Sequence, residues 1–277
     1  VEQEEIPYEW VTGKLGVSAQ TVRGLEKAGA VRVVSTESLR DPVRLAQETA
    51  HGGQMRPMLS DAQRRIAEEI LADFDAGSPG TYLIHGITGS GKTEVYMQIV
   101  EEMVRRGRQA IVLIPEIALT YQTVRRFYAR FGEKVSVINS RQSQGERYDQ
   151  FKRARKGEVQ VMVGPRSALF TPFSRLGLIV IDEEHEPSYK SENSPRYHAR
   201  ETAVKRAELE HARVVLGSAT PSLEAYSRAV SDEYVLVKLK ARYGERPMPK
   251  VSIVDLREEL KAGNRSILSR ELRGGIE

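Results

Sequence analysis

Short apolar runs alternate with amphipathic stretches along the chain from residue 60 onward. The runs are rich in Val, Ile and Leu, as in strands that are buried on both faces, and the stretches between them carry apolar residues at helical spacing. This alternation predicts an α/β fold, in which helices cover both faces of a parallel sheet. The predicted strands span residues 82–85, 110–114, 135–138, 159–163, 178–181, 214–216 and 235–239.

The N-terminal residues show a different pattern. Trp10, Val11 and Leu15 lie at helical spacing, and Gly16 is expected to end that helix, because glycine adopts left-handed backbone angles at little cost. Ser18 is a good N-terminal cap for a second helix, which is predicted to run to Lys27.

The valine-rich residues 31–34 are then expected to form a strand. Two helices joined by a short glycine-containing turn are typical of a helix-turn-helix, and a following strand favours its winged-helix variant. The second helix would approach DNA, or the domain would dock onto its neighbour or another protein; the pattern leaves both open.

A glycine-rich segment carries the first chemical signal. Residues 86–93 match G-x-x-x-x-G-K-[ST], with an apolar strand before them and a helical pattern after them. In such a loop, backbone N–H groups surround phosphate oxygens, Lys92 reaches the β- and γ-phosphates, and the Thr93 hydroxyl binds Mg²⁺. The predicted nucleotide-binding residues are Gly86, Ile87, Thr88, Gly89, Ser90, Gly91, Lys92 and Thr93.

The strand at 178–181 ends in Asp182, Glu183, Glu184 and His185. Ligands of parallel sheets bind at the carboxyl ends of the strands, so Asp182 is placed to hold Mg²⁺ and Glu183 to accept a proton from the attacking water. The catalytic candidates are therefore Lys92, Asp182 and Glu183.

A further strand ends in Gly-Ser-Ala-Thr-Pro-Ser, at 217–222. Its hydroxyl groups would bond to the carboxylates and respond to the nucleotide state. We therefore expect Glu184, His185, Ser218 and Thr220 to couple hydrolysis to movement.

Composition changes this picture little. The 277 residues include 42 Lys and Arg and 38 Asp and Glu, which gives a net charge of +4. The basic residues cluster at 141–156 and at 125–130, which would be either solvated helix faces or surfaces that follow a phosphate backbone.

The absence of cysteine excludes disulfides and thiolate metal sites within the 277 residues. The sequence shows no secretory signal and no apolar stretch long enough to span a membrane, so we expect a cytoplasmic protein.

The order of these motifs resembles the first motor lobe of superfamily 2 helicases. Longer segments resemble the family of primosomal replication-restart helicases, over nearly the whole chain. These segments are LIPEIALT (113–120), GPRSALFTPF (164–173), DEEHEPSYK (182–190), RYHAR (196–200), LGSATPSLEA (216–225) and RPMPKVSIVDLREEL (246–260).

The resemblance implies roles for further residues. Gln63 matches the glutamine that contacts adenine in that family. Two motifs that face single-stranded DNA would contribute Glu116 and Thr120, and Arg166 and Ser167. The loop after the acidic motif would stack on unpaired bases and couple DNA binding to hydrolysis, or its aromatic residues would simply pack onto the lobe; its candidates are Tyr189, Lys190, Arg196, Tyr197 and His198.

The resemblance also implies an organisation. A winged-helix domain (1–45) and a linker (46–58) precede a P-loop, RecA-like helicase lobe (59–230). Residues 231–277 hold the last strand of the lobe and the start of a connection. The chain starts with Val rather than Met, and we expect it to be part of a longer protein with a 3′-end-binding domain, a zinc module and a second motor lobe that supplies an arginine. Zinc is expected only in that other part.

The implied function is an ATP- and Mg²⁺-dependent 3′-to-5′ DNA helicase at stalled or branched forks, which restarts replication through primosome assembly. Its implied partners are branched and single-stranded DNA, single-strand-binding protein and helicase-loading proteins, in the nucleoid of a bacterial cytoplasm. Alone, the chain is expected to bind nucleotide and hydrolyse it slowly. An RNA helicase, a double-strand translocase and a DNA-binding regulator with a nucleotide switch remain alternatives.

Overall fold

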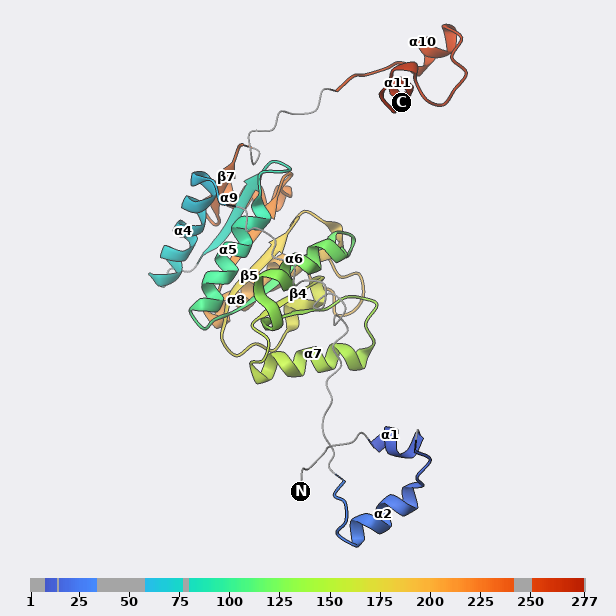
Figure 1. Cartoon of the computed structure of the whole chain (residues 1–277). Coiled ribbons are helices and arrows are strands. Elements are labelled where there is room, and N and C mark those ends of the chain that lie inside the picture. The colour runs from blue at the N-terminus through green and yellow to red at the C-terminus, as the bar shows by residue number, and fades with distance from the viewer. Residues whose placement is uncertain (1–7, 14, 34–57, 77–79, 242–250, 277) are drawn as a thin grey trace.

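A computed structural model of the chain describes residues 8–13, 15–33, 58–76, 80–241 and 251–276 (Figure 1). Its central part is a seven-stranded sheet in the order β3-β4-β2-β5-β6-β1-β7, in which every neighbouring pair is parallel. The strands are β1 (Thr81–Gly86), β2 (Gln109–Leu113), β3 (Val135–Val137), β4 (Val161–Gly164), β5 (Leu176–Asp182), β6 (Arg213–Ser218) and β7 (Val235–Leu239). All seven predicted strands are present, and their ends differ from the predicted ones by at most two residues.

Alternate residues of the strands pack against two separate apolar clusters, as a sheet covered on both faces requires. On β2, Ala110 and Val112 belong to the cluster that holds apolar side chains of α4 (Asp61–Asp75), α5 (Lys92–Arg105) and α6 (Tyr121–Phe131). Ile111 and Leu113 belong to the other cluster, with α7 (Gln144–Lys156), α8 (Ala199–Glu210) and α9 (Leu223–Val230). The predicted α/β fold class is thereby confirmed.

The strand order decides which motifs meet. β5, β6 and β1 are neighbours, so the acidic motif, the Ser-Ala-Thr segment and the glycine-rich loop follow three adjacent strand ends. β2 and β4 come next on the other side of β5, and each is followed by a short 3-10 helix, η1 (Glu116–Ala118) and η3 (Arg166–Phe170). Segments proposed for DNA contact therefore follow the strands beside the acidic motif.

The N-terminal prediction is partly wrong. The first helix, α1 (Tyr8–Gly13), ends before Leu15, which is exposed, rather than at Gly16. Glycine is a poor helix former, and a six-residue helix gains little from cooperativity, which accounts for an end at Gly13. The second helix, α2 (Ala19–Lys27), begins at the predicted cap: Ser18 Oγ accepts a hydrogen bond from the Thr21 amide.

Residues 31–33 form no strand; instead, the Val33 amide donates to Glu26 Oε1. A strand needs a neighbour to pair its backbone groups, and the described residues offer none here. Val34 and the predicted linker, apart from Met58, lie outside the described residues, so the winged-helix assignment stays a prediction. At the other end, residues 251–276 contain the short helices α10 (Leu256–Lys261) and α11 (Arg270–Ile276).

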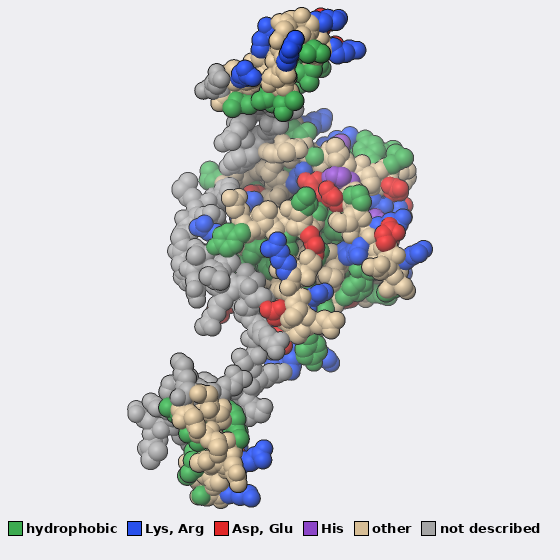
Figure 2. Space-filling model, turned by 90° about the vertical axis from the view of Figure 1, so that its right-hand side faces the viewer, with side chains coloured by type: hydrophobic (Ala, Val, Ile, Leu, Met, Phe, Trp, Pro, Cys, Tyr) green, Lys and Arg blue, Asp and Glu red, His purple; other side chains and the backbone are tan. Residues whose placement is uncertain are grey.

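The basic clusters predicted from the sequence are largely engaged within the protein. On α6, Arg126 and Arg130 each form an ion pair with Glu94 of α5, at 2.7 and 2.9 Å. On α7, Arg147 donates to the Gln142 carbonyl. Figure 2 shows Lys and Arg side chains interspersed with acidic ones on the face of the central part that it displays. These contacts favour the interpretation as helix faces for the α6 group.

Candidate active site and nucleic-acid interface

The glycine-rich loop connects β1 to α5 and leaves the N-terminus of that helix open. Gly91 is the N-cap, with a left-handed φ of 78°, and no side chain caps the helix. This left-handed backbone would be strained for any other residue, and a Cβ on Gly91 would also lie 2.3 Å from Gln63 Nε2, so glycine is strongly favoured here. The free N–H groups and the dipole of the helix favour an anion at this position.

Lys92 is nearly buried, at 8% exposed, and its Nζ donates to the Gly86 carbonyl at 2.9 Å. Within the described residues, no carboxylate forms an ion pair with this ammonium group. A buried cation bonded only to a neutral carbonyl is poorly compensated, so it favours a negatively charged ligand.

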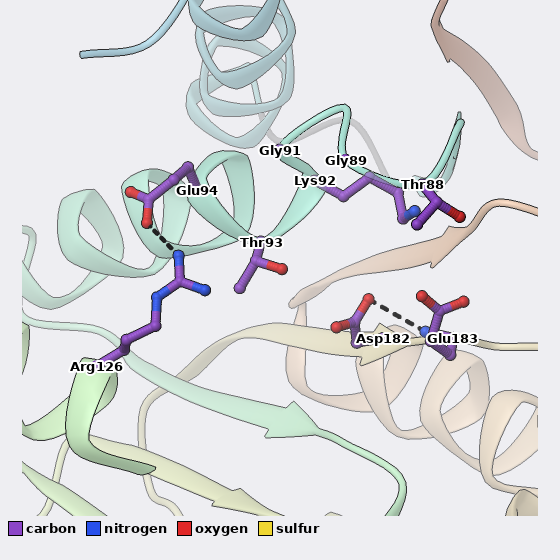
Figure 3. Close-up of a pocket in the computed structure, with 9 residues that line it drawn as sticks. All are labelled: Thr88, Gly89, Gly91, Lys92, Thr93, Glu94, Arg126, Asp182 and Glu183. Carbon is purple, nitrogen blue, oxygen red and sulfur yellow. Dashed lines mark hydrogen bonds and ion pairs between the residues drawn. The ribbon is translucent and has the colours of Figure 1, made fainter. Parts of the chain in front are cut away.

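Asp182 and Glu183 lie at the end of β5, across the pocket from the loop (Figure 3). Glu183 has a left-handed φ of 47°, and its amide donates to Asp182 Oδ1 at 3.1 Å. Burial and the adjacent Glu183 charge raise the pKa of the Asp182 carboxyl to about 6, although Lys92 opposes the shift. Two crowded carboxylates are a suitable environment for a divalent cation.

The raised pKa of Asp182 gives a prediction for the chain in a chelating buffer. Because the folded protein holds this proton up to about pH 6 and the unfolded chain releases it near 3.8, the folded state binds more protons between these values. The contribution of Asp182 to the free energy of unfolding should therefore fall as the pH rises from 4 to 7. At pH 7, the free energy of unfolding of Asp182→Asn, measured by urea denaturation, should be about 1–3 kcal/mol higher than that of the wild type. At pH 4 the variant should have no such advantage. A difference that does not change with pH would contradict this prediction.

Nine residues line the pocket, and most were predicted from the sequence (Figure 3). They are Thr88, Gly89, Gly91, Lys92, Thr93, Glu94, Arg126, Asp182 and Glu183. Glu94 and Arg126 were missed, because no motif marks them and only the packing of α6 against α5 brings them together. Of the remaining loop residues, Gly86 and Ser90 are buried and Ile87 is exposed.

Gln63 is buried behind the loop rather than open to solvent. It accepts a hydrogen bond from the Ser60 amide in a capping box, and its Nε2 donates to the Ser90 carbonyl at 2.8 Å. Both ends of its amide are thus used within the protein, and they connect α4 to the glycine-rich loop. Its contact with adenine stays a prediction, which would require these bonds to be exchanged.

The predicted coupling residues are in contact. His185 Nδ1 and Ser218 Oγ lie 2.8 Å apart, and Ser218 Oγ also accepts from the Thr220 amide. The Glu184 amide donates to the Gly217 carbonyl at 3.0 Å. The acidic motif and the Ser-Ala-Thr segment are therefore joined through both side chains and backbone.

Glu184 anchors a buried network that the sequence analysis did not anticipate. One of its carboxylate oxygens accepts from the Ser222 amide at 2.6 Å; the other accepts from Arg200 Nη1 and Ser222 Oγ, each at 3.0 Å. The side chains of Glu184 and Arg200 are 0% and 6% exposed. Arg200 and Ser222 lie in the quoted segments RYHAR and LGSATPSLEA, but nothing in the sequence shows that they share a carboxylate.

The residues predicted to contact DNA surround the same region. Glu116 is exposed in η1, and Thr120 caps α6 by accepting from the Thr123 amide. Arg166 and Ser167 begin η3 and are both partly exposed.

The loop that follows the acidic motif folds back on itself. Lys190 and His198 form an antiparallel bridge, and the Ser191 amide donates to the Tyr197 carbonyl. Lys190 and Arg196 are exposed, while His198 caps α8 by accepting from the Arg200 amide. Burial and the Arg200 charge lower the pKa of His198, which favours the neutral ring at this cap.

The two aromatic residues of this loop differ. Tyr197 is partly exposed and packs edge-on against Phe170, with ring centroids 5.2 Å apart. Tyr189 is only 1% exposed, and its hydroxyl donates to the Asp182 carbonyl at 2.7 Å. In this conformation its ring cannot stack on a base, so the packing alternative describes Tyr189, whereas Tyr197 is accessible.

The sheet order and the paired motifs at its carboxyl edge define a P-loop lobe of the RecA-like type. A family model described as DEAD/DEAH box helicase matches residues 60–229, and the chain belongs to this helicase family.

The chain is similar to curated relatives named replication restart protein PriA. It is 47% identical to the protein of Bacillus subtilis (strain 168), over 99% of this chain and 34% of the relative. It is 45% identical to the protein of Synechocystis, over 94% of this chain and 31% of the relative. The chain thus spans about a third of these relatives, and they confirm the resemblance drawn from the motifs. The solved structure "Structure of RecG bound to three-way DNA junction" shares the fold, with a TM-score of 0.52 and 21% identity over 82% of this chain and 29% of that one.

Within the described residues, no helix is long and apolar enough to cross a membrane. The same residues hold no group of three or more His, Cys, Asp or Glu side chains arranged to bind a metal. The acidic pair at the pocket therefore falls short of a complete protein-built metal site, as is usual for Mg²⁺ bound together with a nucleotide.

Proposed function

We propose that the chain is the ATP-binding lobe, and part of the DNA surface, of a 3′-to-5′ DNA helicase or translocase that restarts replication at stalled or branched forks. The observation that carries this proposal is the sheet order. The glycine-rich loop, the Ser-Ala-Thr segment, the acidic motif and the two segments proposed to contact DNA follow five neighbouring strands, β1, β6, β5, β2 and β4. Binding of DNA at one part of this edge can therefore act on hydrolysis at the other.

The pocket fits a nucleoside triphosphate with Mg²⁺. The uncapped N-terminus of α5 and the poorly compensated Lys92 suit phosphates, and the Asp182–Glu183 pair suits a cation. Thr93 and Asp182 would hold Mg²⁺, which neutralises charge on the β- and γ-phosphates when bound.

The protein's own groups then have separate tasks. The loop from Gly86 to Thr93 binds and orients the phosphates, and Lys92 carries the positive charge that meets them. Glu183 positions the attacking water and accepts its proton. Glu184, His185, Ser218 and Thr220 carry the change at the γ-phosphate to the rest of the lobe, and Gln63 would recognise adenine.

DNA would follow the edge formed by η1, η3 and the loop after the acidic motif. Arg166 and the exposed Lys190 and Arg196 suit phosphates, Ser167 and Thr120 suit hydrogen bonds, and Tyr197 suits a base. Glu116 lies at the same edge. Tyr189 and His198 act within the protein, at the Asp182 carbonyl and at the N-terminus of α8.

The longer protein would hold the remaining parts. We propose a winged-helix domain at 1–45, the lobe at 59–230 with its last strand at 235–239, and a second lobe that supplies an arginine to the γ-phosphate, worth about 10³–10⁵ in rate. Single-strand-binding protein and helicase loaders would be its partners, in the bacterial nucleoid.

ATP hydrolysis by the full-length protein tests this function. It is measured without nucleic acid, with single-stranded DNA, with single-stranded RNA and with forked DNA, beside a Lys92→Ala variant. We expect single-stranded and forked DNA to stimulate hydrolysis, and Lys92→Ala to abolish it. Stimulation by RNA alone, or by no nucleic acid, would overturn the proposal.

A further inference from the structure

Arg166 is bonded to the loop that follows the acidic motif. Its Nη1 donates to the Ser188 carbonyl, at 3.1 Å, and to the Lys190 carbonyl. Its guanidinium also lies over the ring of Tyr197, 5.8 Å from the centroid. One arginine thus fixes the main chain on both sides of Tyr189.

Tyr189 connects this main chain to the catalytic carboxylates. Its ring is packed in the apolar cluster beneath η3 and α8, and its hydroxyl donates to the Asp182 carbonyl. Asp182 and Glu183 line the nucleotide pocket. A continuous series of contacts therefore runs from Arg166, near the surface, through Tyr189 to the backbone of the acidic motif.

No carboxylate in the part of the chain that the structure describes neutralises the positive charge of Arg166. In contrast, Arg126, Arg130 and Arg200 each form an ion pair with a glutamate. A phosphate group carries the opposite charge and can accept two parallel N–H bonds from one guanidinium, which neutral carbonyls cannot match in charge. A phosphate that reaches Arg166 would therefore compete successfully with the two carbonyls.

We propose that Arg166 is a latch that restrains hydrolysis until DNA is bound, and that Tyr189 transmits its release. Without DNA, Arg166 holds residues 188–190, and Tyr189 holds the Asp182 backbone in the arrangement described here. A DNA phosphate draws Arg166 away from the carbonyls, and the Asp182–Glu183 pair is freed to adjust to nucleotide and water. The inference rests on the proposed DNA-driven ATPase and adds positioning roles for two residues.

The test measures ATP hydrolysis by the full-length protein in the absence of DNA. Arg166→Ala removes the latch, and Tyr189→Phe removes the hydroxyl that contacts Asp182; each should raise the DNA-free rate by about 2- to 10-fold, the equivalent of one hydrogen bond. Arg166→Ala should also weaken binding of single-stranded DNA, whereas Tyr189→Phe should leave that affinity unchanged. If Arg166 were only a phosphate contact, the DNA-free rate would stay the same or fall, and the proposal would be wrong.

Arg206→Ala is the matched control. Arg206 also donates to main-chain carbonyls, those of Leu169 and Thr171 at the far end of η3, but it donates no hydrogen bond to residues 188–190 among the described contacts. This variant should lower the melting temperature without raising the DNA-free rate. An equal rise in Arg206→Ala would mean that general loosening, not a latch, increases the rate.

Hydrogen exchange of the 277-residue chain gives a second readout that needs no hydrolysis. The amides of Tyr189, Lys190 and Ser191 are bonded to backbone carbonyls, and they should exchange about 2- to 10-fold faster in Arg166→Ala than in the wild type. Unchanged exchange would overturn the latch. If instead the wild-type ATPase does not respond to DNA, the proposed function fails, and that result is visible without any variant.

Discussion

A Glu183→Gln variant of the full-length protein is expected to bind ATP as the wild type does and to hydrolyse it about 10²–10⁴ times more slowly. Glutamine keeps the size and a hydrogen-bonding oxygen of the side chain but cannot accept the proton of the attacking water. Glu183 lines the pocket beside Asp182, and its left-handed backbone directs it away from the regular strand. Single-turnover hydrolysis with saturating single-stranded DNA measures the chemical step, and a fluorescent nucleotide measures affinity.

Glu192→Gln provides the control, because Glu192 is an exposed acid in the following loop and does not line the pocket. It carries the same change of charge and should keep nearly the wild-type rate. A loss of less than tenfold in Glu183→Gln would assign proton acceptance to another group. A parallel loss of nucleotide affinity would mean that Glu183 acts in binding instead.

Glu184→Ala should lower the free energy of unfolding of the 277-residue chain by about 3–5 kcal/mol, measured by urea denaturation. The carboxylate is fully buried and is the ion-pair partner of a nearly buried Arg200. Removing it leaves the guanidinium without its main counter-charge and the Ser222 amide without its acceptor. Breaking a buried pair from one side is costly, because the remaining charge stays desolvated.

Two comparisons separate this penalty from ordinary truncation. Replacing both partners, with Glu184→Met and Arg200→Met together, should cost less than Glu184→Ala alone, since no uncompensated charge remains. Glu208→Ala breaks the exposed pair with Lys205 and should change stability by at most about 1 kcal/mol. A cost below 1 kcal/mol for Glu184→Ala would show that solvent reaches this network.

Most strands were predicted well because they are short apolar runs buried on both faces, as β2 and β4 are, a pattern that hardly depends on the neighbours; β7, at the edge of the sheet, is partly exposed. The glycine-rich loop was predictable for a similar local reason: Gly91 requires a left-handed backbone, and its neighbours Lys92 and Thr93 complete the motif. The N-terminal region shows the limit of local patterns. Residues 31–33 resemble a strand in composition, but without a partner among the described residues they do not form one.

The long-range contacts of the site could not be predicted. Arg126 reaches the pocket because α6 packs beside α5, and Arg200 meets Glu184 because α8 begins beneath the acidic motif. Tyr189 looked like a candidate for stacking on bases, yet tertiary packing buries its ring and directs its hydroxyl to Asp182. In each case the partner lies on another element, and its approach depends on helix packing that the spacing of residues does not encode.

By itself, the sequence determined the strands, the phosphate loop and the acidic residues that follow β5, because backbone preference and burial act within a few residues. Tertiary structure alone decided the order of the strands, and with it the adjacency of the acidic motif, the Ser-Ala-Thr segment and the phosphate loop. It also decided that Arg166 bonds to the loop around Tyr189. The physical reason is that hydrogen bonds and ion pairs form only between groups within a few ångströms, and packing of the whole lobe sets those distances.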